Sequence, residues 1–169
     1  LASRMISTPL CIYDCDPPVD GSIAVVVSRR DAVANDRPSV RIEAVGSAMG
    51  MARSAEMMWS RTPHTPRDVD VAQLYDGWSI LALLWLEALG LCPPGSGGRF
   101  VEGGSRIALD GELPLNTGGG HLSGGRLHGF IQLYEACVQL RGRWRPPGRA
   151  VSETGGRGCR RRAFHRLPV

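Results

Sequence analysis

The sequence predicts an α/β fold, in which strands alternate with helices along the chain. Three short runs carry the β-branched or alternating apolar patterns of strands, at residues 23–27, 40–45 and 70–74. Two longer runs, at 80–89 and 127–138, carry helical patterns. Because the strand at 70–74 leads through a short polar turn directly into the helix at 80–89, these residues predict a βα unit.

The first strand, at 23–27, is a continuous apolar run preceded by the turn residues Asp20 and Gly21, so it is predicted to be buried. A short helix is predicted at 30–35. The second strand, at 40–45, alternates between apolar and polar residues, and its apolar face consists of Val40, Ile42 and Ala44.

Residues 46–67 predict a long loop that contains at most a short helix, at 52–59. The segment is rich in Met, Ser and Pro, and loops of this length in compact domains tend to cover sites. Its methionines are predicted to pack the loop or to line an apolar substrate channel, and they are Met49, Met51, Met57 and Met58.

The helix at 80–89 has almost no polar face, which predicts that it is buried between two layers. Gly90 ends this helix, and the pair of prolines that follows prevents its return. A glycine-rich excursion at 95–111 then leads to a short predicted strand at 113–116.

The most informative stretch is a glycine-crowded turn that leads into the last helix. Its five glycines, at positions 118, 119, 120, 124 and 125, let another backbone or a ligand approach closely. The helix is predicted to begin near Gly125 or Arg126, and its unpaired amides would suit an oxyanion, carboxylate or phosphate. A nucleotide loop is disfavoured because the GxGxxG spacing fails at Ser123. The helix is expected to bury its apolar face, which consists of Leu127, Phe130, Ile131, Tyr134, Cys137 and Val138.

Length and composition predict one domain with a core, because the chain has 169 residues and is 43% hydrophobic. The formal net charge of +4 is unevenly distributed: residues 1–141 hold 12 Arg against 15 acidic residues, a net of −3, whereas residues 142–169 hold 8 Arg against 1 Glu, a net of +7. All 20 basic residues are Arg, which we interpret as coding bias. No helix-turn-helix, zinc or aromatic-basic motif accompanies the charge, so nucleic-acid binding is not expected.

The five cysteines are odd in number and irregularly spaced, which indicates a reducing compartment such as the cytoplasm. Cys11 and Cys15 lack a matching Cys or His pair, so no metal site is predicted. Cys137 is interpreted as a small core residue. No secretory segment is expected, and no transmembrane span either, because the most apolar run, at 80–91, is well short of the roughly twenty residues that cross a bilayer.

A set of residues in the glycine-rich stretch is spaced as in a known motif: Asn116, Gly119, Gly120, Gly125, Gly129 and residues 139–142. The motif resembles that of the thiolase superfamily, where Asn, a Gly pair and Gly-His-Pro lead into a helix that ends in Gln-Leu-Arg-Gly. Arg126 stands in the place of the family's catalytic His, Leu127 in the place of its Pro, and His128 follows two residues later. These departures resemble the non-thiolytic, sterol-carrier-type branch of thiolase-like lipid-transfer proteins, which includes aldolases of steroid side-chain degradation.

Earlier segments extend the resemblance. Residues 9–27 are similar to the segment that closes the first half of the two-half thiolase fold, and residues 100–104 to a loop that precedes the motif. Tyr75 holds a place that faces the active site in these families. The resemblance implies a layered βαβα fold, mainly the C-terminal half and incomplete. The predicted parts are a remnant of the N-terminal half at 1–28, a C-terminal thiolase-like domain at 29–142 and a basic tail at 143–169.

The tail lacks the apolar strand pair that the family implies, and its Arg and Pro content predicts disorder. We expect either a truncated or frame-shifted reading of a longer gene or, alternatively, a genuine basic tail.

The resemblance implies an acyl-coenzyme A substrate, no further cofactor, and a reaction that breaks or forms a carbon–carbon bond beside the thioester carbonyl, by retro-aldol cleavage or acyl transfer. It also implies a homodimer at full length and an OB-fold protein as a partner. The alternative is a non-catalytic subunit that binds lipid or acyl-coenzyme A, or an inert fragment.

Two catalytic candidates follow from this resemblance. Tyr75 is the candidate to take the proton from a β-hydroxyl group, and otherwise an amphipathic residue at a strand end. His128, predicted one turn inside the helix, would help to hold the developing enolate oxygen together with the amides of Gly118, Gly119 and Gly120, or would satisfy a loop carbonyl.

Three further side chains are assigned to the glycine-rich stretch. Arg126 is predicted to bind a phosphate or carboxylate of the substrate, and otherwise to be solvated. Asn116 and His121 are predicted to brace the loop through side-chain to backbone hydrogen bonds, with Asn116 also on the substrate side.

Overall fold

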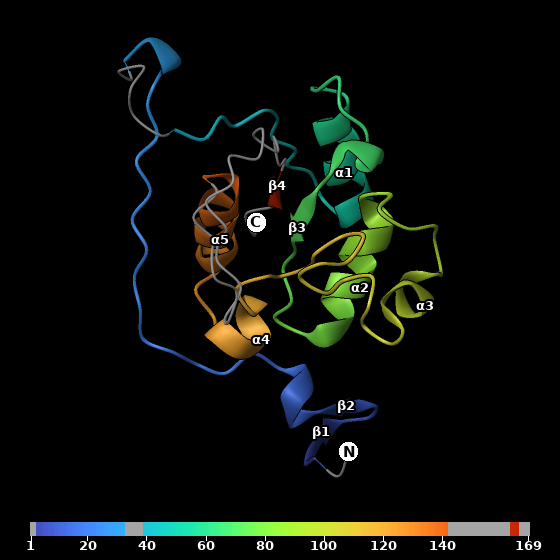
Figure 1. Ribbon diagram of the computed structural model, residues 1–169. Helices are drawn as coiled ribbons and strands as arrows, with labels where there is room; N and C mark the ends of the chain where they lie inside the picture. The colour runs from blue at the N-terminus through green and yellow to red at the C-terminus, as the bar shows by residue number, and fades with distance from the viewer. Residues whose placement is uncertain (1–2, 33–38, 142–162, 166–169) are drawn as a thin grey trace.

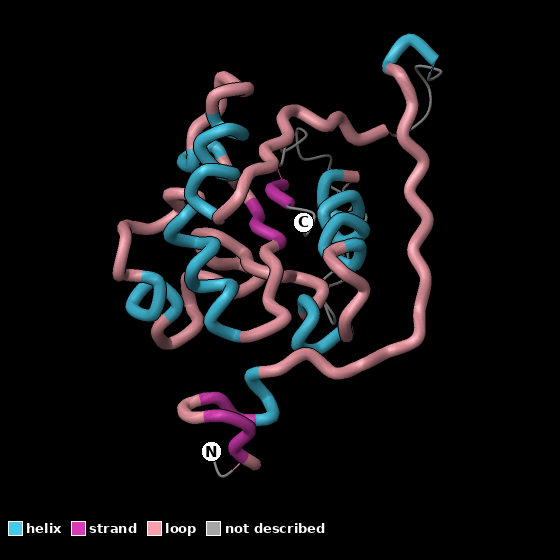
Figure 2. The backbone as a smooth tube through the Cα atoms, turned by 180° about the vertical axis from the view of Figure 1, so that it is seen from behind, coloured by secondary structure: helices cyan, strands magenta, loops and turns pink. Residues whose placement is uncertain are grey.

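A small sheet lies at the centre of the chain, with helices on both sides of it (Figures 1 and 2). The computed structural model describes residues 3–32, 39–141 and 163–165. Helix α5 (Phe130–Leu140) covers one side of the sheet, and helices α1 (Met51–Trp59) and α2 (Ser79–Ala88) lie on the other. The layered α/β fold predicted from the sequence is thereby confirmed. The central strands and shorter helices are β3 (Val71–Gln73), β4 (Ala163–His165), α3 (Gly97–Val101) and α4 (Gly120–Gly124).

Strand β3 is the middle of the sheet because it is paired on both edges. On one edge it pairs with β4 in parallel, with Ala72 opposite Phe164. On the other edge it forms a parallel bridge to Leu115, where Ala72 N–H donates to Pro114 O at 2.9 Å and Asn116 N–H donates to Ala72 O at 2.9 Å. The predicted strand at 113–116 is thus a single bridge, and it fixes the start of the glycine-rich stretch against β3.

The main core lies between β3 and helices α1 and α2. Leu74 and Leu86 are completely buried, and each such leucine stabilises the fold by about 1.5–3 kcal/mol relative to an exposed one. The predicted helices at 52–59 and 80–89 are confirmed as α1 and α2. The prediction that α2 is buried between two layers is only partly correct, because the residues Ile80 and Leu84 on this helix are each 44% exposed.

Helix α5 turns its polar side inward, contrary to the prediction from its apolar spacing. Phe130 is 41% and Tyr134 57% exposed, although both belong to the face that was expected to be buried. The helix also begins at Phe130 rather than near Gly125, and a separate short helix, α4, precedes it. The side of α5 that packs on the described chain consists of Gln132, Glu135, Ala136 and Gln139.

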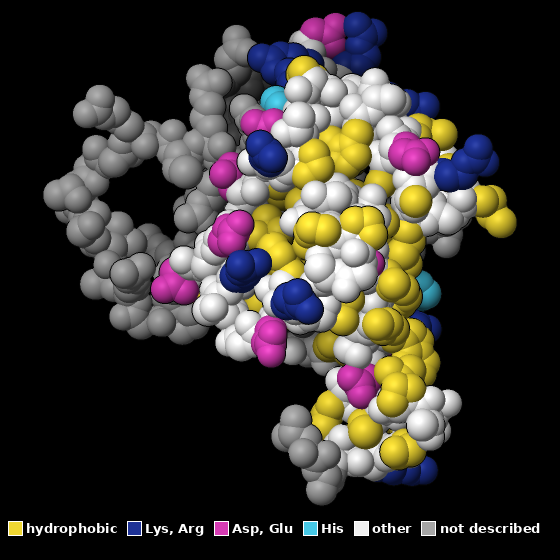
Figure 3. All heavy atoms as spheres, turned by 90° about the vertical axis from the view of Figure 1, so that its right-hand side faces the viewer, with side chains coloured by type: hydrophobic (Ala, Val, Ile, Leu, Met, Phe, Trp, Pro, Cys, Tyr) yellow, Lys and Arg dark blue, Asp and Glu magenta, His cyan; other side chains and the backbone are white. Residues whose placement is uncertain are grey.

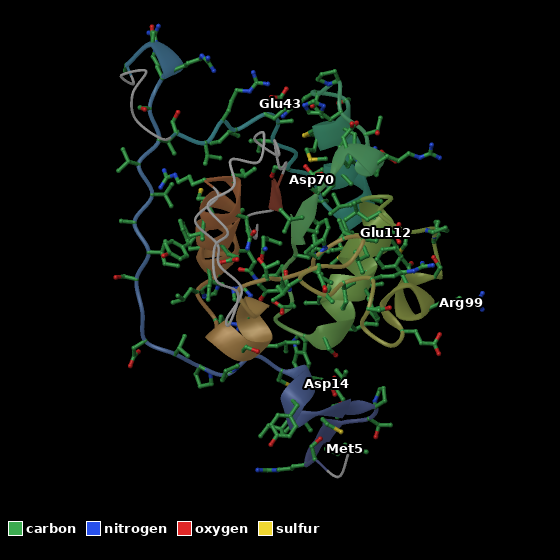
Figure 4. The ribbon with its side chains drawn as sticks, viewed as in Figure 1. Met5, Asp14, Glu43, Asp70, Arg99 and Glu112 are labelled. Atoms are coloured by element: carbon green, nitrogen blue, oxygen red, sulfur yellow. The ribbon has the colours of Figure 1, made fainter. Side chains whose placement is uncertain are left out.

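The N-terminal residues form a hairpin beside the body of the molecule (Figure 1). Its strands, β1 (Met5–Ser7) and β2 (Leu10–Cys11), are antiparallel and lead into the 3-10 helix η1 (Ile12–Asp14). Asp14 lies where the hairpin meets the body (Figure 4), and its Oδ1 accepts a hydrogen bond from Ser79 Oγ at 2.7 Å. This contact ties the hairpin to the start of α2.

Two predicted strands are wrong in the described structure. Residues 23–27 run without a partner strand, and Val26 is 93% exposed rather than buried. Residues 40–45 are also irregular, with Ile42 exposed. A β-branched pattern forms a strand only where another strand accepts its hydrogen bonds, and the described residues supply none at these places.

Two further predictions fall partly outside the described residues. The predicted helix at 30–35 is present as the 3-10 helix η2 (Arg30–Ala32), and the rest of it lies outside the described chain. In the predicted tail, the expected disorder is wrong at residues 163–165, which form β4 and pair with the central strand. Residues 142–162 and 166–169 lie outside the description.

Hydrophobic side chains gather on the surface over the N-terminal hairpin and the adjoining side of the body (Figure 3). The exposed members in the hairpin region are Met5, Ile6, Ile12 and Tyr13. Within the described chain no helix is long and apolar enough to cross a membrane. The same residues contain no group of three or more His, Cys, Asp or Glu placed to hold a metal ion.

Candidate functional site

Tyr75 lies just beyond the end of β3, where the central strand gives way to the turn before α2. Its ring is half-buried and packs edge-to-face on His121, with ring centroids 4.8 Å apart. Its hydroxyl lies against Gly77, because a Cβ built at that glycine would sit 2.5 Å from the Tyr75 oxygen. Only glycine at position 77 leaves room for the phenol in this orientation.

Asp76, the next residue, fastens the glycine-rich stretch to the end of β3. Its buried carboxylate accepts hydrogen bonds through Oδ1 from the His121 N–H at 2.7 Å and from Gln132 Nε2 at 3.2 Å. Gly120 has φ +61, and a Cβ there would collide with Asp76 Oδ2. The close approach of this turn to Asp76 therefore requires glycine.

The His121 ring is completely buried beside this carboxylate. Its Nε2 accepts the Gly129 N–H at 3.0 Å, so the ring proton of the neutral form sits on Nδ1, which is 4.0 Å from Asp76 Oδ1. Burial lowers the pKa of His121 and outweighs the attraction of Asp76. Burial also raises the pKa of Asp76, against the opposing effect of the hydrogen bonds from the backbone of His121 and Leu122. The predicted bracing role of His121 is confirmed by the Gly129 bond.

Asn116 begins the turn in a left-handed conformation, with φ +46. Its Oδ1 accepts the Leu74 N–H at 2.7 Å, which confirms the predicted brace from side chain to backbone. Its carbonyl accepts the Gly119 N–H at 2.7 Å. The Gly119 amide therefore closes the turn.

A cluster of hydrogen-bonded polar side chains joins the turn to β3 and to α5. Thr117 Oγ1 donates to Glu135 Oε1 at 2.6 Å and accepts from Gln73 Nε2 at 2.7 Å. Gln139 Nε2 donates to Glu135 Oε1 at 2.8 Å. These bonds explain why α5 buries its polar side, since every one of them joins the helix or the turn to a polar partner.

Arg126 leaves the turn and pairs with a carboxylate of the same chain. Its Nε donates to Asp16 Oδ2 at 2.8 Å, and the Asp16 side chain is only 9% exposed. The pKa of Arg126 is raised, first by this hydrogen bond and next by the charge of Tyr75, with a smaller hydrogen-bonding contribution from the same phenol. Gly77 connects this pair to Tyr75, because Asp16 N–H donates to Gly77 O at 3.2 Å and the Tyr75 oxygen lies against Gly77.

His128 lies at the surface, apart from this group. It precedes α5 with φ +48, so its predicted place one turn inside a helix is wrong. The left-handed backbone at His128 and at Gly129, which has φ +85, delays the start of the helix to Phe130. His128 is connected to the cluster through the next residue, Gly129, whose N–H is bonded to His121, and its charge is among the minor causes that lower the pKa of His121.

Sequence reasoning missed the two carboxylates of the site. Asp76 stands in the polar turn after the predicted strand, directly beside the candidate Tyr75, and that position is the signal that points to it. Asp16 is separated from Arg126 by 110 residues, and no local pattern connects the two.

Comparisons with known proteins agree with the arrangement of strand end, glycine turn and helix. Residues 32–155 match the family model described as Thiolase C-terminal domain-like. The chain is 34% identical to the 17-hydroxy-3-oxo-4-pregnene-20-carboxyl-CoA lyase of Mycobacterium tuberculosis, over 83% of this chain and 41% of the relative. It is 33% identical to sterol carrier protein 2 of Rattus norvegicus, over 84% of this chain and 30% of the relative.

A solved structure is similar as well. The Ltp2-ChsH2(DUF35) aldolase matches with a TM-score of 0.64 and 25% identity, over 83% of this chain and 42% of that chain. This chain therefore spans less than half the length of each of these relatives.

Proposed function

Because this chain belongs to the Thiolase C-terminal domain-like family, we propose that it supplies part of the active site of an acyl-coenzyme A lyase of lipid or steroid breakdown. The reaction proposed is retro-aldol cleavage of a β-hydroxyacyl-coenzyme A. The names of the relatives support this class, since one is a carboxyl-CoA lyase and another an aldolase. The activity is proposed for a protein that contains this chain together with the remaining part of such relatives.

One observation carries the choice of reaction: an arginine and a tyrosine lie together where the resemblance implies a catalytic histidine. Arg126 holds the histidine's place, and a guanidinium stays protonated, so it cannot accept the proton that thiolysis requires. Tyr75 carries an oxygen at the strand end, against Gly77, which is bonded to the Asp16 that holds Arg126. This pair favours chemistry in which the phenol oxygen removes a hydroxyl proton.

In the proposed step, the deprotonated Tyr75 oxygen takes the proton of the substrate's β-hydroxyl group. The oxygen's electron pair forms a carbonyl at the β-carbon as the bond between the α- and β-carbons breaks. The bonding electrons pass into the thioester, which becomes an enolate. The proton held by Tyr75 then passes to the α-carbon, directly or through water, which restores the deprotonated phenol. The products are a carbonyl compound and a shortened acyl-coenzyme A, so atoms and charge balance.

The enolate oxygen requires hydrogen-bond donors near the glycine turn. Since the Gly119 amide is bonded to Asn116, the proposal rests on the amides of Gly118 and Gly120 together with His128. The surface position of His128 supports a role at the entrance of the site, where it would meet the substrate from the solvent side.

The test is to assay retro-aldol cleavage and thiolysis in the longer protein that contains this chain. Tyr75→Phe deletes only the phenol oxygen and is expected to lower retro-aldol kcat by about 100-fold or more. The control, Tyr134→Phe, removes an exposed hydroxyl and should leave turnover unchanged. Efficient thiolysis by the parent would overturn the reaction, and full turnover by Tyr75→Phe would remove Tyr75 as the base. Binding of acyl-coenzyme A without any turnover would instead support the alternative, a non-catalytic binding subunit.

We also propose that the longer protein forms a homodimer and binds a second protein of the OB-fold, acyl-coenzyme A-associated type. The name of the solved relative, which joins an aldolase to a DUF35 component, supports the second part. Co-purification of a tagged longer protein with the product of a neighbouring gene would test it, and light scattering would test the dimer.

A further inference from the structure

Arg126 is held by a group from a distant part of the chain. Its Nε donates to the Asp16 carboxylate at 2.8 Å, and the Tyr75 phenol, whose oxygen lies against Gly77, is among the causes that raise the pKa of Arg126. Asp16 is itself fixed, because its N–H donates to Gly77 O at 3.2 Å and the Arg126 N–H donates to the carbonyl of the next residue, Pro17, at 3.3 Å. Gly77 is also the residue on which the phenol oxygen rests.

We propose that Asp16 is a positioning residue, which holds the Arg126 guanidinium against the Tyr75 phenol oxygen so that its charge faces the base of the reaction. The inference deepens the proposed function and rests on it. It assigns a role to a carboxylate that lies in the N-terminal segment, outside the glycine-rich motif.

The contacts favour this role over that of an ordinary surface ion pair. Exposed pairs contribute little because water screens them and long side chains lose entropy on pairing. Here the Arg126 side chain is 44% exposed, but that of Asp16 is only 9% exposed and Asp16 is also bonded at its backbone, so the fold fixes the acidic partner that Arg126 binds. A positive charge fixed near the phenol oxygen would stabilise negative charge on that oxygen during the proposed proton transfer.

The arrangement also explains why an arginine can replace a histidine here. An arginine alone is a poor acid or base, but it donates several hydrogen bonds in a fixed fork. The Nε of the fork binds Asp16, whose N–H is in turn bonded to Gly77, the residue that the Tyr75 oxygen lies against. In this arrangement Tyr75 acts as the base, and Arg126 stabilises the negative charge on the Tyr75 oxygen.

The contact itself is tested in the 169-residue chain by nuclear magnetic resonance of the arginine side chains. The Nε–H signal of Arg126, assigned through its loss in Arg126→Lys, is expected to move in Asp16→Asn and also in Tyr75→Phe. Tyr134→Phe and Asp20→Asn, which alter exposed residues, should leave it in place. A signal unmoved by Tyr75→Phe or by Asp16→Asn would overturn the proposed contact, whatever the reaction is.

The role is tested by kinetics in the longer protein. Asp16→Asn is expected to lower retro-aldol kcat by about tenfold with KM nearly unchanged, and Arg126→Gln by about 100-fold. In a Tyr75→Phe background neither change should lower kcat further, because all three act on one oxygen. Asp16→Glu, which keeps the carboxylate, should restore part of the rate.

Two outcomes separate this inference from the proposed function. Loss of turnover in Tyr75→Phe with full turnover in Asp16→Asn would leave Tyr75 as the base and remove the role of Asp16. Effects of Asp16→Asn that add fully to those of Tyr75→Phe would also overturn the inference, since a merely structural role lowers the rate in every background.

Discussion

The carboxylate of Asp76 accepts the backbone N–H of His121 at 2.7 Å, and the two residues are separated by 45 positions in the sequence. This bond joins the turn after β3 to the glycine-rich stretch, so it sets the distance between Tyr75 and the glycine amides. Asp76 therefore helps to fix the geometry of the site.

We predict that Asp76→Ala destabilises the chain by about 2–4 kcal/mol, because it leaves the buried donors of His121 and Gln132 without their acceptor. Asp76→Asn keeps one acceptor oxygen and should cost less. Urea unfolding followed by circular dichroism measures both, with the exposed Asp110→Ala as a control expected to change stability by less than about 0.5 kcal/mol. Equal losses of unfolding free energy for Asp76→Ala and Asp110→Ala would show that the hydrogen bonds to Asp76 do not stabilise the fold.

Gly120→Ala should be more harmful than an alanine at another left-handed glycine. Gly104 has φ +74 with open space around its Cβ position, whereas Gly120 has φ +61 and faces Asp76 Oδ2. Gly104→Ala is therefore expected to cost about 1–2 kcal/mol from the backbone alone. Gly120→Ala adds a collision between the new Cβ and the Asp76 carboxylate. The midpoint of thermal unfolding should therefore fall further for Gly120→Ala than for Gly104→Ala. Similar midpoints for the two variants would show that the turn can move away from Asp76.

The stability of the chain should fall as the pH is lowered from 7 to below about 6.5, because His121 is held neutral. The pKa of His121 in the fold lies below the ordinary value of 6.5. As the pH falls below 6.5, the unfolded chain therefore takes up a proton at this residue that the folded chain does not yet bind, and the free energy of unfolding decreases. The raised pKa of Asp76 acts with the opposite sign, at pH values above 3.8, since protonation of that carboxyl relieves its burial.

The measurement compares the parent with His121→Gln, which keeps an acceptor for the Gly129 N–H but does not titrate. Urea unfolding at pH 7 and at pH 5.5 gives the change in unfolding free energy for each protein. The parent should lose more stability than the variant, and His64 and His128 cancel in the difference because both proteins contain them. A parallel loss in the two proteins would mean that His121 takes up its proton as readily in the fold as in the unfolded chain.

The outer face of α5 should make the 169-residue chain associate with itself. Phe130 and Tyr134 are exposed on this helix, and contiguous apolar surface favours contact with other molecules. Size-exclusion chromatography at increasing concentration is expected to show association, which the double variant Phe130→Ser with Tyr134→Ser should reduce. Leu109→Ser, at an exposed site away from the helix, is the control. A compact monomer at all concentrations would contradict this prediction.

The elements that the sequence predicted correctly are those whose signals are local. Helix α2 follows from its apolar run and from the glycine that stops it, and β3 from its short apolar run before a polar turn. The strands at 23–27 and 40–45 failed because a strand depends on partners elsewhere, which no local pattern reports.

The site shows the same division. The candidate Tyr75 came from the place that the family resemblance gives it in the turn, and its catalytic role stays a prediction. The bracing roles of Asn116 and His121 came from residue type and glycine spacing and are confirmed. Asp16 was missed because its contact with Arg126 spans 110 residues. The start of α5 was misplaced because helical spacing includes Leu127, while the left-handed backbone at His128 interrupts the helix after it.

Because α5 buries its polar side, the usual strategy of placing apolar residues inside a helix and polar residues outside it cannot be applied to this helix by residue type alone. A redesign that replaced buried Gln132, Glu135 or Gln139 with leucine would remove the partners of Asp76 and Thr117 and loosen the glycine turn. Polar substitutions belong instead at the apolar positions on the outer side, which make none of these bonds. An engineer guided only by hydrophobicity would choose the wrong side of the helix.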